Sequence, residues 1–245
     1  MSLKRIQIAG AILLLLGLGA ACDDNRGYVT TETRSVAPEG AAKAEVRLEM
    51  GAGELRLNSA EQANLLEASF EFNRERLRPE VLYRVVGGKG ILDVRHGRRH
   101  SINFGPTKNR WDLTLGRALP LDLDINLGAG HSELDLRDLN LTKVEIDMGV
   151  GEVDLDLRGP HAAGFLVKID GGVGSAKLAL PYEVGVRVKV DGGLGSVNPR
   201  GLTKQSKGVY VNDAYGKSPV TIEVDIDAGI GSLDLNAEPS SRIRI

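Results

Sequence analysis

The stretch DMGVGEVDLDL, residues 147–157, decides the fold. Apolar and acidic residues alternate on both sides of its Gly-Val-Gly, which is the period-two pattern of β-strands with one buried face. The apolar residues occupy even positions up to Met148 and odd positions from Val153 onward. A straight strand with this change of phase would turn its apolar side to solvent. We therefore expect a bulge or tight corner at the glycines.

Six copies of Gly-x-Gly mark such corners along the chain. Their glycines are Gly51, Gly53, Gly128, Gly130, Gly149, Gly151, Gly172, Gly174, Gly193, Gly195, Gly229 and Gly231. The first glycines of the middle four copies are 21, 23 and 21 residues apart. The pattern predicts an all-β fold, a single-stranded parallel β-helix or solenoid with rungs of about 20–23 residues. We expect the residue between the glycines, such as Val150, Val173 or Leu194, to face the core.

Acidic side chains precede most of the corners by two positions. They are Glu49, Asp147, Asp170, Asp191 and Asp227, with Asn126 at the second copy. Stacked rungs would place them in a column in which like charges repel. Two explanations stay open: the carboxylates cap the turns or are solvated, or they are ligands of a cation such as calcium. No complete metal or cofactor motif is present, and we expect no cofactor.

Composition excludes a nucleic-acid surface, because the formal net charge is −2 and aromatic residues make up only 4% of the chain. No group of residues has the pattern of a catalytic site, and we expect a protein without enzymatic activity. The alternative is an enzyme acting on envelope polysaccharide, with carboxylate pairs. Those pairs would come from Glu133, Asp135, Asp154 and Asp156.

Three further features have structural interpretations. Residues 95–100, with His96 and His100, form a basic stretch that we interpret as a solvated loop, with contact to an anionic headgroup or polymer as the alternative. Trp111 is expected in the core. Residues 209–219 lie in the widest gap between late copies, and we expect them to cap the stack or to carry specific contacts.

The N-terminus has the pattern of an export signal. Lys4 and Arg5 precede an apolar stretch that ends at Cys22, the only cysteine. The stretch is too short to span a bilayer, which takes about 20 residues. It resembles a bacterial lipoprotein signal over residues 1–21, with lipid attached to Cys22. We expect a flexible tether over residues 22–44 and a solenoid domain over 45–245, irregular at 45–110 and regular at 111–236.

Two stretches resemble known families. Trp111-Asp-Leu-Thr-Leu with LPLDLDINLGAG, residues 119–130, resembles the bacterial toast-rack domains. Residues 184–195, 209–215 and 224–232 are similar to the C-terminal domain of LiaF-type cell-wall-active-antibiotic response proteins. The resemblance covers residues 108–236, more weakly from 45. It implies an all-β stack outside any enzyme class and a role in sensing or regulating envelope stress.

These observations together predict an exported, lipid-anchored protein of the cell envelope. We expect a binding or scaffold module whose partners are the membrane, through the lipid, and an envelope protein or polymer. An adhesin-like surface stalk is the alternative.

Overall fold

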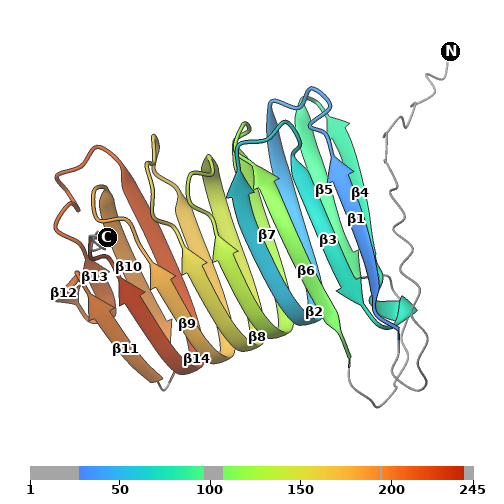
Figure 1. Ribbon diagram of the computed structural model, residues 1–245. Coiled ribbons are helices and arrows are strands. Elements are labelled where there is room, and N and C mark those ends of the chain that lie inside the picture. Colours follow the sequence, from blue (N-terminus) through green and yellow to red (C-terminus); the bar gives the residue numbers. More distant parts are fainter. Residues whose placement is uncertain (1–27, 97–106, 194, 240–245) are drawn as a thin grey trace, which may run out of the picture.

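The computed structural model describes residues 28–96, 107–193 and 195–239, and it consists almost entirely of β-strands (Figure 1). The strands are β1 (Thr30–Val36), β2 (Lys43–Ala60), β3 (Leu66–Phe72), β4 (Pro79–Val86), β5 (Lys89–His96), β6 (Asn109–Gly116), β7 (Leu121–Asp135), β8 (Leu141–Asp156), β9 (Leu166–Ala179), β10 (Gly185–Gly192), β11 (Gly195–Arg200), β12 (Thr203–Ser206), β13 (Val209–Val211) and β14 (Thr221–Asn236). One turn of 3₁₀ helix, η1, spans Glu75–Leu77. Within these residues no helix has the length and apolarity needed to cross a membrane.

Each long strand forms one rung that bends at its Gly-x-Gly. β2, β7, β8, β9 and β14 each continue through the corner, and neighbouring rungs pair in parallel along both halves. The register aligns equivalent positions of the repeat: Ile125 lies beside Ile146, which lies beside Ile169. The all-β solenoid with Gly-x-Gly corners is therefore confirmed.

The rungs do not stack in chain order. Along the sheet the strands follow the order β1-β3-β6-β2-β7-β8-β9-β14-β10-β13-β12. β14 comes last in the chain but lies between β9 and β10, and its second half pairs with β11. At the other end, the two halves of β2 pair with β5 and β6. The rung beyond β2 thus consists of β5 and β6, and the rung beyond β14 consists of β10 and β11.

The N-terminal part is more regular than the sequence indicates. The tether expected over residues 22–44 is shorter, because Thr30–Val36 form β1 and pair with β3. β2, within the region expected to be irregular, is a full rung between β6 and β7. Its alternating burial from Lys43 to Ala60 follows the same pattern as the later rungs.

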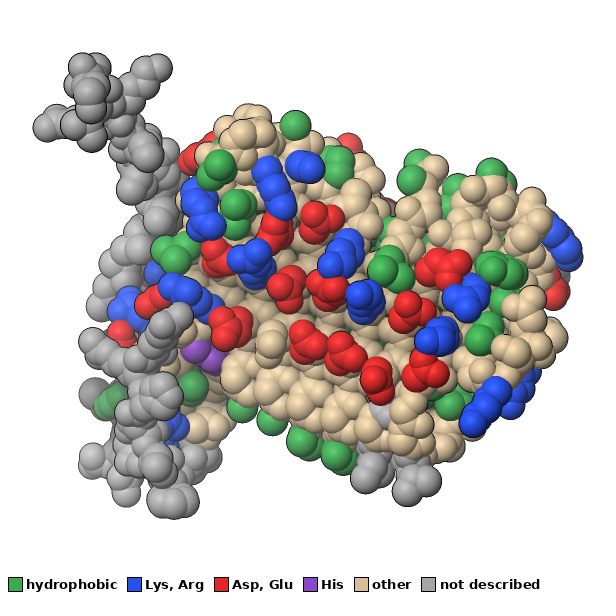
Figure 2. Space-filling model, turned by 180° about the vertical axis from the view of Figure 1, so that it is seen from behind, with side chains coloured by type: hydrophobic (Ala, Val, Ile, Leu, Met, Phe, Trp, Pro, Cys, Tyr) green, Lys and Arg blue, Asp and Glu red, His purple; other side chains and the backbone are tan. Residues whose placement is uncertain are grey.

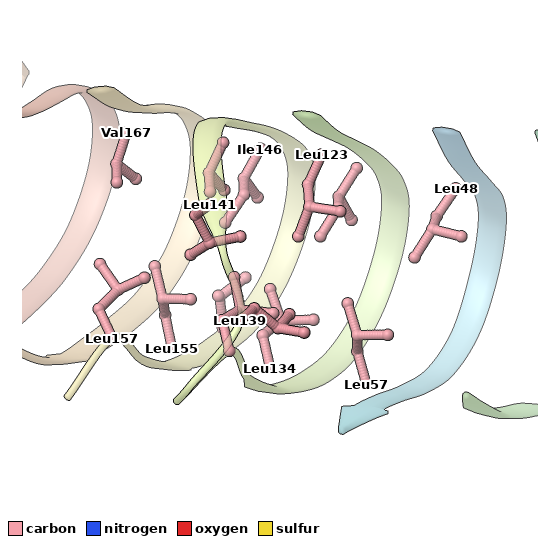
Figure 3. Close-up of a cluster of buried hydrophobic side chains, with 14 of the residues drawn as sticks. Leu48, Leu57, Leu123, Leu134, Leu139, Leu141, Ile146, Leu155, Leu157 and Val167 are labelled. Atoms are coloured by element: carbon pink, nitrogen blue, oxygen red, sulfur yellow. The ribbon is translucent and has the colours of Figure 1, made fainter. Parts of the chain in front are cut away.

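The core lies inside the curve of the rungs. Figure 3 shows Leu48 and Leu57, from the two halves of β2, pointing into the space that the bent strands enclose. Leu139, from the connection between β7 and β8, packs into the same core and is buried. Trp111 is fully buried, as predicted. The connections therefore contribute apolar side chains that help to enclose the core.

The corner changes the phase of the strand, but not in the predicted way. Met148 and Val153 are both buried, which confirms the change of phase. The prediction that the central residue faces the core is wrong, because Val150 is 55% exposed and Val173 is 49% exposed. A Cβ placed on Gly151 would lie 1.9 Å from the carbonyl oxygen of Gly130. Because adjacent rungs pack closely at the corners, the central residue of the Gly-x-Gly, here Val150 or Val173, lies on the convex outer side. Leu194 lies outside the described residues.

This placement gives a paired test. Val150→Ser should change the free energy of unfolding by no more than about 0.5 kcal/mol, since the side chain is largely exposed. Val153→Ser should cost about 2 kcal/mol or more, because it removes buried methyl groups and buries a hydroxyl. Urea unfolding of both variants measures the difference. Equal costs would contradict the outward position of Val150.

Candidate functional site

The acids before the corners form a column in register across six rungs, as the sequence predicts. In stacking order the acidic column is Glu49, Asn126, Asp147, Asp170, Asp227 and Asp191. All six side chains are exposed. Figure 2 shows acidic side chains in a row on this face, above hydrophobic side chains along the lower edge. Neighbouring positions in the column lie about 4.8 Å apart, the spacing of paired strands.

The centre of the acidic column lacks basic partners. Within the described part of the chain, Asp147, Asp170 and Asp227 form no ion pair and accept no hydrogen bond, whereas Asp191 pairs with Lys189. Partial burial and the charge of Asp170 raise the pKa of Asp147. Within the described residues these three side chains therefore cap no turn, which favours the solvated form of the first explanation. No group of three or more His, Cys, Asp or Glu side chains among the described residues is placed to hold a metal ion.

Removing one charge from the acidic column should stabilise the fold. The folded-state pKa of Asp147 is raised, so its ionised form opposes folding near neutral pH and this effect fades as the pH falls toward that pKa. Asp147→Asn, which copies Asn126 on the neighbouring rung, should add about 0.2–1 kcal/mol at low salt. The gain should shrink at 1 M NaCl. Urea unfolding at both salt concentrations measures it, and a loss of stability at low salt would contradict the argument.

Beside the acidic column, exposed apolar side chains follow the outside of the corners. The corner ridge consists of Ala52, Ala129, Val150 and Val173, which are aligned by the strand register. A shallow cavity of ≈ 490 Å³ lies along the column between Asn126 and Asp227. The face formed by the first halves of the rungs, which we call the first face, thus combines unpaired carboxylates with a line of small apolar side chains.

The opposite face, formed by the second halves of the rungs, carries the four carboxylates considered for catalysis. Glu133 and Asp154 lie side by side, as do Asp135 and Asp156. Each has a basic neighbour: Arg56 lies 3.0 Å from Glu133, Lys177 lies 3.3 Å from Asp154, Arg137 lies 2.6 Å from Asp135 and Arg158 lies 2.6 Å from Asp156.

The hydrogen bond from Arg137 lowers the pKa of Asp135. A general acid in glycoside hydrolysis needs the opposite shift, toward a raised pKa. Asp135 is therefore a poor candidate for the general acid, and all four carboxylates, each beside a basic group, can accept hydrogen bonds on a binding surface.

His96 is part of the packed structure, so the interpretation of residues 95–100 as a solvated loop is wrong at this position. The backbone N–H of Gly51 donates to Nδ1 of His96 at 3.3 Å. The ring lies edge-on to Trp111, with the ring centroids 5.0 Å apart. Burial lowers the pKa of His96. His100, Arg98 and Arg99 lie outside the described residues, as does Cys22.

The shifted pKa makes stability depend on pH. Because the folded state binds a proton on His96 less readily than the unfolded state, its contribution is present above about pH 6.5 and is lost as the pH falls through the folded pKa. His96→Asn should remove this dependence. The difference in unfolding free energy between the two proteins should therefore become smaller as the pH falls from about 7.5 to 5.5. A difference that is constant over this range would exclude the effect.

Residues 209–219 close one end of the stack. β13 pairs with β10 and β12, and Asn212 is buried beside the end of β10. The side chain of Asn212 accepts a hydrogen bond from the N–H of Val186 at 2.9 Å and donates one to the carbonyl of Val184 at 2.8 Å. The capping interpretation is confirmed. Sequence reasoning did not single out Asn212, because a buried amide has no distinct pattern.

Comparison with known proteins agrees with this architecture. The family model described as the N-terminal domain of toast_rack, DUF2154, matches residues 25–179, which lie further toward the N-terminus than the resemblance at 108–236. The crystal structure of a candidate cell adhesion protein from Clostridium sporogenes is 33% identical, with a TM-score of 0.82, and covers 86% of this chain and 100% of that chain. A candidate adhesin from Bacteroides fragilis is 12% identical, with a TM-score of 0.35, and covers 86% of this chain and 98% of that one.

No curated protein matches the sequence. The family match spans more than half of the residues, and the Clostridium sporogenes protein shares both sequence and the bent parallel stack. The chain therefore belongs to the toast-rack family.

Proposed function

We propose that the protein is a non-enzymatic adhesion or scaffold module of the bacterial cell envelope, held to a membrane by lipid on Cys22. The observation that carries the proposal is the pair of long faces on which outward side chains stand in register from rung to rung. Such faces present the same chemistry repeatedly, which suits an extended partner bound at many points. The name of the Clostridium sporogenes relative supports adhesion.

The arrangement of charged groups also supports binding over catalysis. The four carboxylates of the second face repeat from rung to rung and are matched by basic side chains. A hydrolase needs one carboxyl group with a raised pKa beside one that stays ionised. The resemblance of residues 184–232 to LiaF-type proteins supports a link between this binding and envelope stress.

Two assays test the proposal. The chain should incorporate labelled fatty acid in bacterial cells, and Cys22→Ala should abolish the incorporation. The full chain carrying Cys22→Ala should sediment with isolated bacterial cell envelopes in a saturable manner. Failure to sediment would overturn the binding role. Release of reducing ends from the envelopes, abolished by Asp154→Asn, would replace it with the polysaccharide-active enzyme.

A further inference from the structure

A groove crosses the second face of the stack. In Figure 1 this face lies on the side nearer the viewer. It has a volume of ≈ 580 Å³ and passes over β2, β7, β8, β9, β14 and β11. Leu134, Leu155 and Leu178 lie along its floor, where they contribute backbone because their side chains are buried in the core. The groove therefore runs across the strands and not along any one of them.

Two rows of outward side chains flank this groove. The row nearer the corners is Glu133, Asp154, Lys177, Asp234 and Asn198. The row farther from the corners is Asn58, Asp135, Asp156, Ala179, Asn236 and Arg200. Asn198 on β11 donates a hydrogen bond of 2.8 Å to Asp234 on the neighbouring strand β14. All but Ala179 carry donors or acceptors, so a ligand in the groove meets polar groups on both sides.

The spacing of these rows selects the kind of ligand. A chain that crosses the strands meets a new pair of polar groups about every 4.8 Å. An extended peptide advances only about 3.3 Å per residue and would fall out of step with the rungs. A pyranose unit in an extended glycan has a length close to the rung spacing, and each unit carries hydroxyl groups that both donate and accept hydrogen bonds.

The charged side chains along the groove favour a neutral polymer as the ligand. Four carboxylates of the groove have basic neighbours within 3.3 Å, unlike the centre of the acidic column on the first face. An anionic polymer would approach these carboxylates, whereas neutral hydroxyl groups can donate to them in charge-assisted hydrogen bonds. None of the described residues that line the groove is aromatic, so no ring is available for stacking. Binding is therefore weak at each rung and depends on contacts repeated along the polymer.

We propose that this groove binds a neutral, linear glycan strand that lies across the rungs. The inference deepens the proposed adhesion function and rests on it. The two rows supply the hydrogen bonds. The small side chain of Ala179 on β9 leaves more space for the glycan than the longer side chains on the other rungs. No bond is made or broken, and the glycan is released unchanged.

The experiment uses the full chain with Cys22→Ala and fully N-acetylated chitohexaose, which is a neutral linear oligosaccharide, in a titration followed by NMR chemical shifts. Saturable shifts should map to β8, β9 and β14 on the groove side. Asn198→Ala should weaken binding about three- to tenfold through the loss of one hydrogen bond. Ala179→Ile should abolish binding by filling the groove.

Asp170→Ala is the matched control, because it lies on the same strand as Ala179 but on the first face. It should leave the affinity for chitohexaose unchanged. Equal weakening by Asp170→Ala, or equally tight binding of the anionic polymer heparin, would overturn the groove as a neutral glycan site. Sedimentation with envelopes in the absence of chitohexaose binding would also overturn it while leaving the adhesion function in place.

Discussion

Gly174→Ala should destabilise the protein by about 3–5 kcal/mol, the sum of strain at a positive φ and overpacking at the corner. Gly174 has a φ of 152°. A Cβ at this position would lie 1.8 Å from the carbonyl oxygen of Gly151. Relief would require the two rungs to separate at the corner, which would disturb strand pairing on both sides. Thermal unfolding should show a fall in Tm of about 10 °C or more.

Gly171→Ala is the matched control for this prediction. Gly171 lies on the same strand, has no positive φ, and a Cβ placed there would meet nothing within 4 Å. The substitution should stabilise the protein by about 0.4–1 kcal/mol, because alanine reduces the freedom of the unfolded chain. If both variants had the stability of the parent protein, the close stacking of glycine corners would be wrong.

Trp111→Ala should cost about 3–5 kcal/mol by leaving a large cavity in the core. Trp111 is fully buried on β6, where it lies opposite Leu55 on one side and Phe70 on the other. Its ring meets that of Phe70 edge-on, with centroids 5.5 Å apart. This residue therefore ties the N-terminal strands to the first complete rung. Urea unfolding followed by circular dichroism measures the loss.

Trp111→Phe separates packing from hydrogen bonding. The indole N–H of Trp111 has no hydrogen-bond partner among the described residues. Phenylalanine keeps most of the buried ring and removes this unpaired donor, so its cost should be about 1–2 kcal/mol, well below that of alanine. A cost for phenylalanine equal to that for alanine would show that the indole N–H has a partner and that packing is not the main contribution.

Much of the first face could be predicted from local patterns. The alternation around residues 147–157 and the intervals between corners were enough to align Asn126, Asp147 and Asp170 in one column. This worked because equal spacing brings equivalent residues into register when rungs stack in parallel. The basic partners of Glu133 and Asp156 could not be predicted in the same way. Arg56 lies 77 residues before Glu133 in the chain, outside the regular spacing of the middle corners, and Arg158 lies in the connection that follows β8.

The sequence by itself determined the all-β class, the bent rungs and the positions of the corners. These properties follow from period-two alternation and from glycine, which act within a few residues of one another. Tertiary structure decided that β14 lies between β9 and β10, that β1 pairs with β3, and that Val150 points outward. Every rung has the same pattern of alternation, so the pattern cannot say which copies become neighbours. The direction of a side chain at a bend depends on which side of the corner the next rung packs against, and alternation defines faces only along a straight strand.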